Sequence, residues 1–382
     1  MEKGWWLLNL SVGSFPPSDT LFPYLRNFIV QTASNKESPN CETAVGAASK
    51  VERIILSGAR QYPPISLEID SVVSKRPILV KIFFPDESSR SFQLDSAMTA
   101  NELLRRVHRK LDSDQGQWAG CAIYIVTDAF EMSIPNKAYI FDAVAEAGVQ
   151  NTAYRLVFKK KLWMGKEDTS SDALNNIIYH QTLPLYLDAL LVCPVTDPEE
   201  KLQEAAFLAA LQYKASEDDL RKNQNFGELF RKYIPASLVS QKSKDAWTET
   251  ILSAYTSLLN GKSPADAKAM FVDAVRKWPF YGSSFFHVKQ SFDGALPENL
   301  IMCVNIRGIS ILDVETRQSR LHFKIGEIAS WTYGPKHFSM KIHDLQSGDK
   351  FIFHTTSGEE ITDLLEDYIS FLLDQKSKGK KK

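Results

Sequence analysis

Residues 277–290 constrain the fold most, because the hydrophobic period changes within them. Upstream, apolar residues recur at three- and four-residue steps as far as Trp278, which predicts a helix, and Pro279 ends it by removing a backbone donor. Downstream, Phe286 and Val288 alternate with polar residues, which predicts a strand. This change of period therefore marks a boundary. Before it the chain predicts a mixed region of strands and helices followed by a helical region, and after it β-hairpins closed by one helix. It indicates a modular α+β chain.

The composition is that of an ordinary globular chain with several domains. At roughly 150 residues per domain, the 382 residues suggest two or three domains. The formal net charge of −1 argues against a nucleic-acid-binding chain. The longest apolar run, residues 183–195, is interrupted by Pro184 and Asp188 and is too short to span a membrane. The short apolar segment at residues 5–8 lacks a following cleavage site, so we expect no secretory signal.

The sequence contains no recognisable catalytic or metal-binding motif. Phosphate-loop, dinucleotide, nucleophile-elbow and zinc-protease patterns are absent. The four cysteines are widely separated, which favours a reduced cytoplasmic protein over disulfides or a zinc site. His337, His343 and His354 lie on neighbouring predicted strands, but no acidic or thiol residue accompanies them at ligand spacing. We therefore expect no catalytic residues, no metal ion, no cofactor and no enzymatic activity.

Residues 1–74 are predicted to be helical. Two apolar stripes indicate helices, one over residues 21–29 and one over residues 45–55, which ends at Gly58. The segment has more aromatic surface than so few residues can bury. We expect both that helices precede it in a longer chain and that some rings pack on the next domain. The rings concerned are Trp5, Trp6, Phe15 and Phe22.

Residues 76–163 and 164–279 predict two differently built domains. In the first, a hairpin over residues 79–94 is followed by a capping box at Thr99 and Glu102, a helix and further strands, which is the order of a ubiquitin-like roll. In the second, helices are predicted over residues 172–180, 184–192, 199–213, 226–233, 246–259 and 265–278. The second domain is therefore predicted to be an all-α bundle.

Residues 280–375 predict a β-sandwich closed by one helix. A series of short strands runs to His354, and a capping box at Ser357 begins a helix with an apolar stripe from Ile361 to Leu372. This order is that of pleckstrin-type and phosphotyrosine-binding modules. Residues 376–382 contain only Lys, Ser and Gly, so we expect a disordered basic tail.

The order of roll, bundle and sandwich resembles a FERM domain over about residues 76–375. The preceding segment, GWWLLNLSVGSFPPS at residues 4–18 and RQYPP at 60–64, is similar to the C-terminal part of a myosin tail homology 4 (MyTH4) domain. The stretches WPFYGSSFFHVKQ at 278–290 and KKLW at 160–163 are most similar to class VII unconventional myosin tails.

This resemblance implies a FERM cloverleaf: a ubiquitin-like roll, an all-α bundle like acyl-CoA-binding protein, and a pleckstrin/phosphotyrosine-binding-like sandwich. It also implies a non-enzymatic tail region that binds cargo or adaptor proteins for an actin-based myosin. Such a protein would be cytoplasmic and cytoskeleton-associated, at the plasma-membrane cortex or in cell protrusions. A phosphoinositide-recruited linker between membrane and cytoskeleton is the alternative function.

The predicted peptide-binding site is the strand over residues 328–333. It is expected at a free sheet edge, where an extended peptide can add as a further strand beside the closing helix. A purely structural role in the core is the alternative for each of its residues. The candidates are Ile328, Ser330, Trp331, Tyr333 and Tyr368.

Two further candidate sites follow from the resemblance. Some FERM domains hold an acidic lipid headgroup between the first and third lobes, and the candidates here are Lys159, Lys160 and Lys161. Class VII tails also dock on their own motor domain through two basic residues, three apart, in the hairpin before the last strand. Lys350 matches the second position, whereas Ser347 occupies the first. For the three lysines, solvated strand-end side chains are the alternative.

Overall fold

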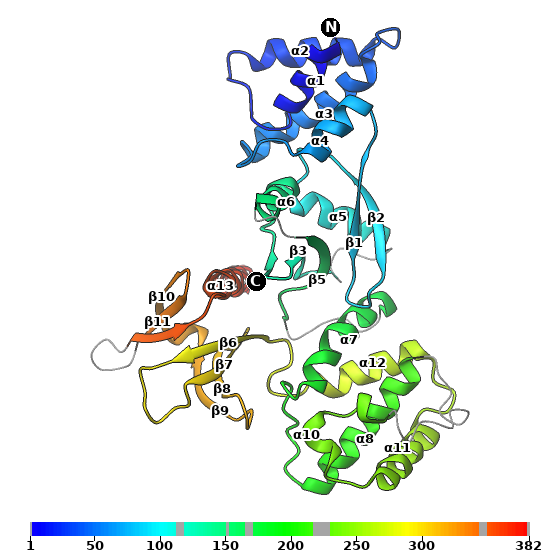
Figure 1. The fold of residues 1–382 in the computed structure, drawn as a ribbon, viewed down its shortest axis with the longest axis vertical. Helices are drawn as coiled ribbons and strands as arrows, with labels where there is room; N and C mark the ends of the chain where they lie inside the picture. Colours follow the sequence, from blue (N-terminus) through cyan, green and yellow to red (C-terminus); the bar gives the residue numbers. More distant parts are fainter. Residues whose placement is uncertain are drawn as a thin grey trace. The chain divides into compact units, whose positions relative to one another are not determined.

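The computed structural model describes residues 2–111, 118–149, 153–164, 171–216, 230–343 and 350–379. The chain forms two compact units. Figure 1 shows the helices and strands that build them, coloured along the sequence. One contains Met1–Asp114 and Cys121–Lys159, and the other contains Gln115–Gly120 and Lys160–Lys382. No helix within the described ranges has the length and apolar character needed to cross a membrane.

The first unit begins with four helices that share a small core. They are α1 (Glu2–Ser11), α2 (Phe22–Ser34), α3 (Cys41–Ser57) and α4 (Ser66–Ser74). Trp5 stacks on Phe28 with ring centroids 5.1 Å apart, and Phe22 packs on the same core. Phe15 is exposed. Trp5 and Phe22 thus serve the helices' own core, so the expectation that these rings pack on the next domain is wrong for them.

The rest of the first unit is a roll with a five-stranded sheet in the order β2-β1-β5-β3-β4. Strand β1 pairs antiparallel with β2 and parallel with β5, as a ubiquitin-like roll requires. The predicted capping box is present, since Thr99 and Glu102 cap α5. The elements are β1 (Ile78–Phe83), β2 (Ser89–Leu94), α5 (Ala100–Lys110), β3 (Cys121–Thr127), β4 (Glu131–Ser133), α6 (Ile140–Val149) and β5 (Tyr154–Lys160).

Buried ion pairs join the four helices to the roll. Arg60 donates through Nε to Asp142 at 2.8 Å, and its Nη1 pairs with Glu68. The backbone N–H groups of Gln61 and Ile65 donate to Asp142 and Glu68 respectively. The side chains of Arg60 and Glu68 are 0% exposed. The segment RQYPP at residues 60–64 was singled out in the sequence only by its family resemblance. In the structure, its buried polar contacts connect the four helices to the roll.

The second unit begins with a helical bundle. Helix α7 continues through Pro184, so the prediction of separate helices over residues 172–180 and 184–192 is wrong. Buried Thr182 and Tyr186 flank the proline, and their packing offsets the backbone bond that the proline removes. Of the predicted helix 226–233, residues 226–229 lie outside the described residues. The elements are α7 (Asp172–Leu187), α8 (Pro198–Ala215), η2 (Phe230–Lys232), α10 (Ala236–Val239), α11 (Lys244–Leu258) and α12 (Pro264–Val275).

The bundle gives way to strand at the predicted change of period. Helix α12 ends at Val275 and strand β6 begins at Ser284. Gly282 lies in the left-handed region with φ of 71°, and a Cβ there would lie 2.6 Å from the Cβ of Trp163. This close approach requires glycine, because any side chain would collide with the indole side chain. The tight connection holds the sandwich against the segment around Trp163.

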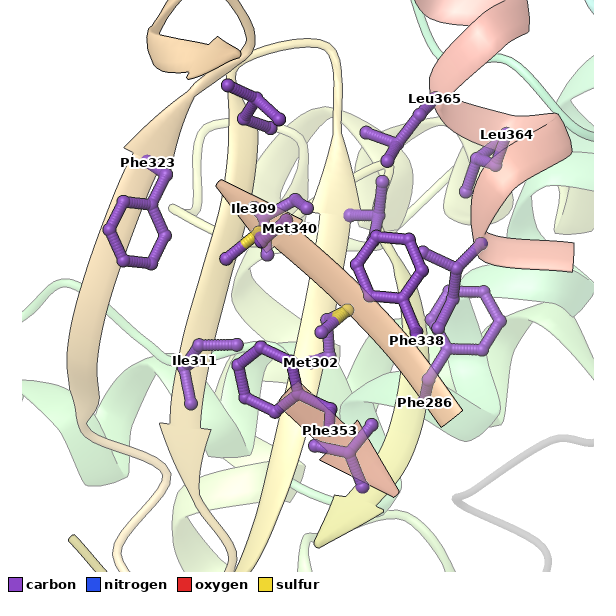
Figure 2. Packing of buried hydrophobic residues seen from close by; sticks show 14 of the residues in the cluster. Phe286, Met302, Ile309, Ile311, Phe323, Phe338, Met340, Phe353, Leu364 and Leu365 are labelled. Carbon is purple, nitrogen blue, oxygen red and sulfur yellow. The ribbon is translucent and has the colours of Figure 1, made fainter. Parts of the chain in front are cut away.

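The sandwich is one seven-stranded sheet in the order β10-β11-β12-β6-β7-β8-β9. Its core contains Phe286, Met302, Phe338 and Phe353, and Figure 2 shows Leu364 and Leu365 of α13 extending toward these side chains. The closing helix therefore plugs the sandwich as predicted. The elements are β6 (Ser284–Gln290), β7 (Asn299–Asn305), β8 (Gly308–Asp313), β9 (Ser319–Lys324), η3 (Ile325–Glu327), β10 (Ile328–Gly334), β11 (His337–Ile342), β12 (Lys350–His354) and α13 (Gly358–Gly379).

Helix α13 continues into the segment predicted to be disordered. It ends at Gly379, so the prediction is wrong for residues 376–379, whereas residues 380–382 lie outside the described residues. Adding residues to an existing helix costs little, and lysines near a helix C-terminus interact favourably with its dipole.

Candidate functional site

Strand β10 forms one edge of the sandwich sheet, as the sequence predicts. Among the described strands it pairs only with β11, in an antiparallel register from Ile328↔Ile342 to Gly334↔His337. In an antiparallel strand, alternate residues direct their N–H and C=O groups away from the partner. The β10 edge, defined as residues Ile328–Gly334, therefore presents backbone groups that a further strand can pair with.

Helix α13 starts directly against the end of the β10 edge. A Cβ at Gly358 would lie 2.9 Å from the Tyr333 Cβ and 2.9 Å from the His337 carbonyl oxygen. Glycine thus lets the first turn of the helix approach the β10–β11 hairpin more closely than any other residue would allow. An extended peptide added to β10 would have α13 as its neighbour at this end.

The side chains of the β10 edge divide into core and surface. Ile328 is buried in the sandwich core, so it has the purely structural role that was the alternative to peptide contact. Trp331 is half-buried and packs on the same core, while Ser330 is exposed. Tyr333 is 48% exposed although it contacts the start of α13. Trp331 and Tyr333 are therefore the apolar side chains that a bound peptide could contact.

Tyr368 does not belong to this edge. It is 1% exposed in the sandwich core, and its hydroxyl accepts a hydrogen bond from the backbone N–H of Trp163 at 3.2 Å. The hydroxyl also donates to the Gly282 carbonyl at 3.5 Å. Its placement as a candidate peptide contact is therefore wrong, because the phenol joins the sandwich to the segment that precedes the bundle.

Lys350 has a basic neighbour that the sequence does not reveal. The β11–β12 register places Lys341 directly opposite Lys350, and both side chains are exposed. Directly opposed residues project from the same face with Cβ atoms about 5 Å apart. Ser347, the other residue of the predicted motor-docking hairpin, lies outside the described residues. Lys341 and Lys350 thus place two positive charges side by side, and only the strand register could identify this pair.

The three lysines predicted to contact lipid do not form one basic patch. Lys159 pairs with Glu131 and lies 4.1 Å from the Tyr124 ring centroid. Lys160 is buried and donates to the Ala119 carbonyl at 3.1 Å. Lys161 pairs with Asp367 at 2.5 Å. Each ammonium group is already engaged by the protein. Buried Lys160 is not available to a headgroup, and its placement there is wrong.

The described residues offer no metal centre. No group of three or more His, Cys, Asp or Glu side chains within the described ranges could hold a metal ion. His337 and His354 do lie opposite one another across β11 and β12. No third ligand joins these two imidazoles within the described ranges, so the strand register accounts for their proximity.

Family models match almost the whole chain in four consecutive pieces. The MyTH4 domain matches residues 1–71, an RA-like domain 76–162, the FERM central domain 166–286 and a PTB domain of IRS-1 type 286–373. The order is the one expected of a helical segment followed by the three lobes of a FERM domain.

Similar curated proteins are mainly unconventional myosins. Myosin-VIIa of Drosophila melanogaster is 28% identical over 99% of this chain, and unconventional myosin-VIIb of Mus musculus is 25% identical over 99%. The chain spans 17% and 18% of those two proteins. The kinesin-like protein KIN-14E of Arabidopsis thaliana is 24% identical over 96% of the chain and is covered to 31%.

Solved structures give the same result. The human Myosin 7b C-terminal MyTH4-FERM domain, determined in complex with the harmonin-a PDZ3 domain, has a TM-score of 0.81 and 26% identity. The alignment covers 97% of this chain and 75% of that chain. The Dictyostelium discoideum Myosin VII MyTH4-FERM MF1 domain has a TM-score of 0.73 at 20% identity, covering 96% and 74%, and shares the fold.

Proposed function

The chain is a MyTH4 segment followed by a FERM domain, similar to class VII myosin tails, and we propose that it binds cargo or adaptor proteins for an actin-based motor. In this proposal the chain recognises other proteins and catalyses no reaction. It acts in the cytoplasm on the actin cytoskeleton, at the cortex or in protrusions. The observation that carries the proposal is the β10 edge.

The β10 edge supports recognition of an extended peptide. Main-chain hydrogen bonds to β10 would supply affinity, and alternate peptide side chains would contact Trp331 and Tyr333. Lys341 and Lys350 on the same sheet, and Lys336 in the turn between β10 and β11, are exposed and favour an acidic partner. We therefore propose a partner segment with alternating apolar residues and flanking acidic residues. The human myosin 7b region was solved with a bound protein domain, which is consistent with a partner-binding role for such regions.

Peptides selected from a random library on the full chain would test this proposal. The selected peptides should carry the predicted pattern and bind Tyr333→Ala about tenfold more weakly, equal to about 1.4 kcal/mol, because the variant loses an exposed aromatic contact. Tyr24→Ala is the matched control, since Tyr24 is a more exposed aromatic, at 77%, in the other unit. Equal affinity for both variants would reject the β10 edge as the binding site. Ile328→Asp is unsuitable, because it would bury a charge in the core.

A second function, docking on the motor domain, is supported by the Lys341–Lys350 pair. Two adjacent ammonium groups on one exposed face can bind a carboxylate or an acidic loop. Binding of the chain to a class VII motor domain should weaken on Lys341→Glu, Lys350→Glu and most on the double variant. Lys81→Glu, at an exposed lysine in the first unit, is the control. An equal loss of motor binding in that variant would show a general effect of charge and reject the Lys341–Lys350 pair as the docking site.

Recruitment by acidic lipids has less support. Lys159 and Lys161 are paired with carboxylates, and Lys160 is buried. If Lys159 or Lys161 left its partner to bind a lipid, the carboxylate of Glu131 or Asp367 would remain nearby and repel the headgroup. Co-sedimentation with vesicles of phosphatidylcholine, with and without a phosphoinositide and at two salt concentrations, separates this alternative from protein binding.

A further inference from the structure

A cavity of about 480 Å³ lies in the second unit, away from the β10 edge. It is lined by residues of α7, α8 and α10 and by the turn between β8 and β9. Its size falls within the range of small-molecule sites, roughly 300–1,000 Å³. Apolar side chains such as Leu191, Ala205, Leu238 and Trp278 line it. The cavity can therefore accept an apolar body larger than a few water molecules.

Tyr186 lines this cavity and carries a buried phenol. Tyr186 is 2% exposed, and its hydroxyl has no hydrogen-bond partner among the described residues. The ring is held by edge contacts with Phe271 and Trp278, at centroid distances of 5.6 and 6.0 Å. Burial, and then the nearby Cys193 and Glu204, raise the pKa of Tyr186, so the hydroxyl keeps its proton. It is thus a donor that lacks an acceptor, which is costly for a buried group.

Arg317 supplies the second donor, from a strained turn. Its Nη2 donates to the Asp188 carbonyl at 3.5 Å, while its Nη1 has no hydrogen-bond partner among the described residues. Arg317 has φ of 58°, and Ala189, which also lines the cavity, has φ of 55°. Non-glycine residues avoid this conformation, and such strain concentrates at functional sites. Two independent strained residues therefore border one cavity.

We propose that this cavity binds a ligand with a carboxylate on an apolar body. The carboxylate supplies the acceptors that Tyr186 and Arg317 lack, and guanidinium groups bind carboxylates with well-matched geometry. Lys201 also lines the cavity and adds positive charge. Asp188, Glu204 and Glu315 also line the cavity and oppose that charge. Burial raises the pKa of the Glu204 carboxyl, an effect that nearby Lys277 lessens. A free organic acid and the C-terminal carboxylate of a peptide both present this chemistry.

The test uses the full chain and two matched pairs of probes. The free-acid pair is 4-phenylbutyrate and 4-phenylbutanamide, and the peptide pair is acetyl-Gly-Gly-Phe with a free or an amidated C-terminus. Affinities are measured by ligand-observed NMR titration. At least one acid should bind tenfold or more tightly than its amide, and the pair that does so identifies the source. If neither acid binds, or each amide binds as well as its acid, the proposal is overturned.

Two variants locate the bound acid, and one serves as a control. Tyr186→Phe and Arg317→Gln should each weaken binding at least tenfold, whereas Trp331→Ala at the β10 edge should leave it unchanged. Tyr186→Phe should not lower the melting temperature, because the lost hydroxyl satisfied no described partner. A clear fall would show that the hydroxyl is already bonded within the protein and would overturn the proposal. Failure here leaves peptide binding at β10 untouched, since the two sites share no residue.

Discussion

Replacing Arg60 with Met should strongly destabilise the first unit. The substitution leaves Glu68 and Asp142 buried without their shared cation. Removing one partner of a buried ion pair costs about 3–5 kcal/mol. Arg60 has two carboxylate partners, which raises the cost, but both carboxylates keep backbone N–H donors, which lowers it. We therefore expect a loss of about 4 kcal/mol in the free energy of unfolding, in the middle of that range.

Thermal unfolding measured by circular dichroism would check this value. For a unit of 150–250 residues, about 1 kcal/mol corresponds to roughly 2–4 °C, so the melting temperature of the first unit should fall by about 8–16 °C. Adding Glu68→Gln to Arg60→Met should recover at least about 1 kcal/mol, because one stranded charge is removed. A double variant as unstable as the sum of the single variants would contradict this coupling.

An exposed ion pair in the same unit is the matched control. Arg26 pairs with Glu52 at 2.6 Å, but these side chains are 55% and 51% exposed. Exposed pairs contribute at most about 1 kcal/mol, so Arg26→Met should lower the melting temperature by no more than a few degrees. If Arg60→Met costs as little as Arg26→Met, then burial of the Arg60 cluster does not stabilise the joint between the four helices and the roll.

Two further predictions concern buried residues. Burial lowers the pKa of His108 to about 4 from its ordinary 6.5, so only the unfolded chain binds a proton between these values. The free energy of unfolding should therefore fall as pH drops from 6.5 to 4, and His108→Leu should remove that slope in urea titrations. Gly282→Ala places a Cβ against Trp163 at a positive φ, and should cost more than about 2 kcal/mol, whereas Gly261→Ala, with open space around it, should cost only the strain. An equal loss of unfolding free energy in the two variants would show that the Trp163 side chain moves away from the added Cβ at little cost.

Local periodicity was sufficient to predict the kind and order of the domains. The change of period at Pro279 and the capping box at Thr99 depend on residues close together in the chain. The prediction of two separate helices in place of α7 was wrong because it considered only the local energetic cost of Pro184 within a helix. The packing of Tyr186 on Phe271 and Trp278, which stabilises the helix after the proline, involves residues far away in sequence.

The candidate site was predictable only in part, because side-chain environment depends on tertiary contacts. Lys160 has a residue type that suits a surface, yet the fold buries it. Tyr368 lies on the apolar stripe of α13, and only the fold shows that it is buried in the core and does not reach the β10 edge. Lys341 becomes relevant only through its register with Lys350. The phenol of Tyr186 lies in a helix whose apolar stripe merely indicates burial, so no sequence pattern could reveal that its hydroxyl has no partner in the part of the chain that the structure describes.

Hydrogen exchange on the β10 strand would test the central proposal most directly. The amides of Ile328–Gly334 would be followed by mass spectrometry in the full chain, with and without a peptide selected from the library. If the peptide adds as a strand, the outward amides of β10 should exchange at least tenfold more slowly when it is bound, while the opposite edge strand, Ser319–Lys324, should not change. Saturating peptide that leaves β10 exchange unaltered would contradict the proposal that this edge is where the chain captures its partners.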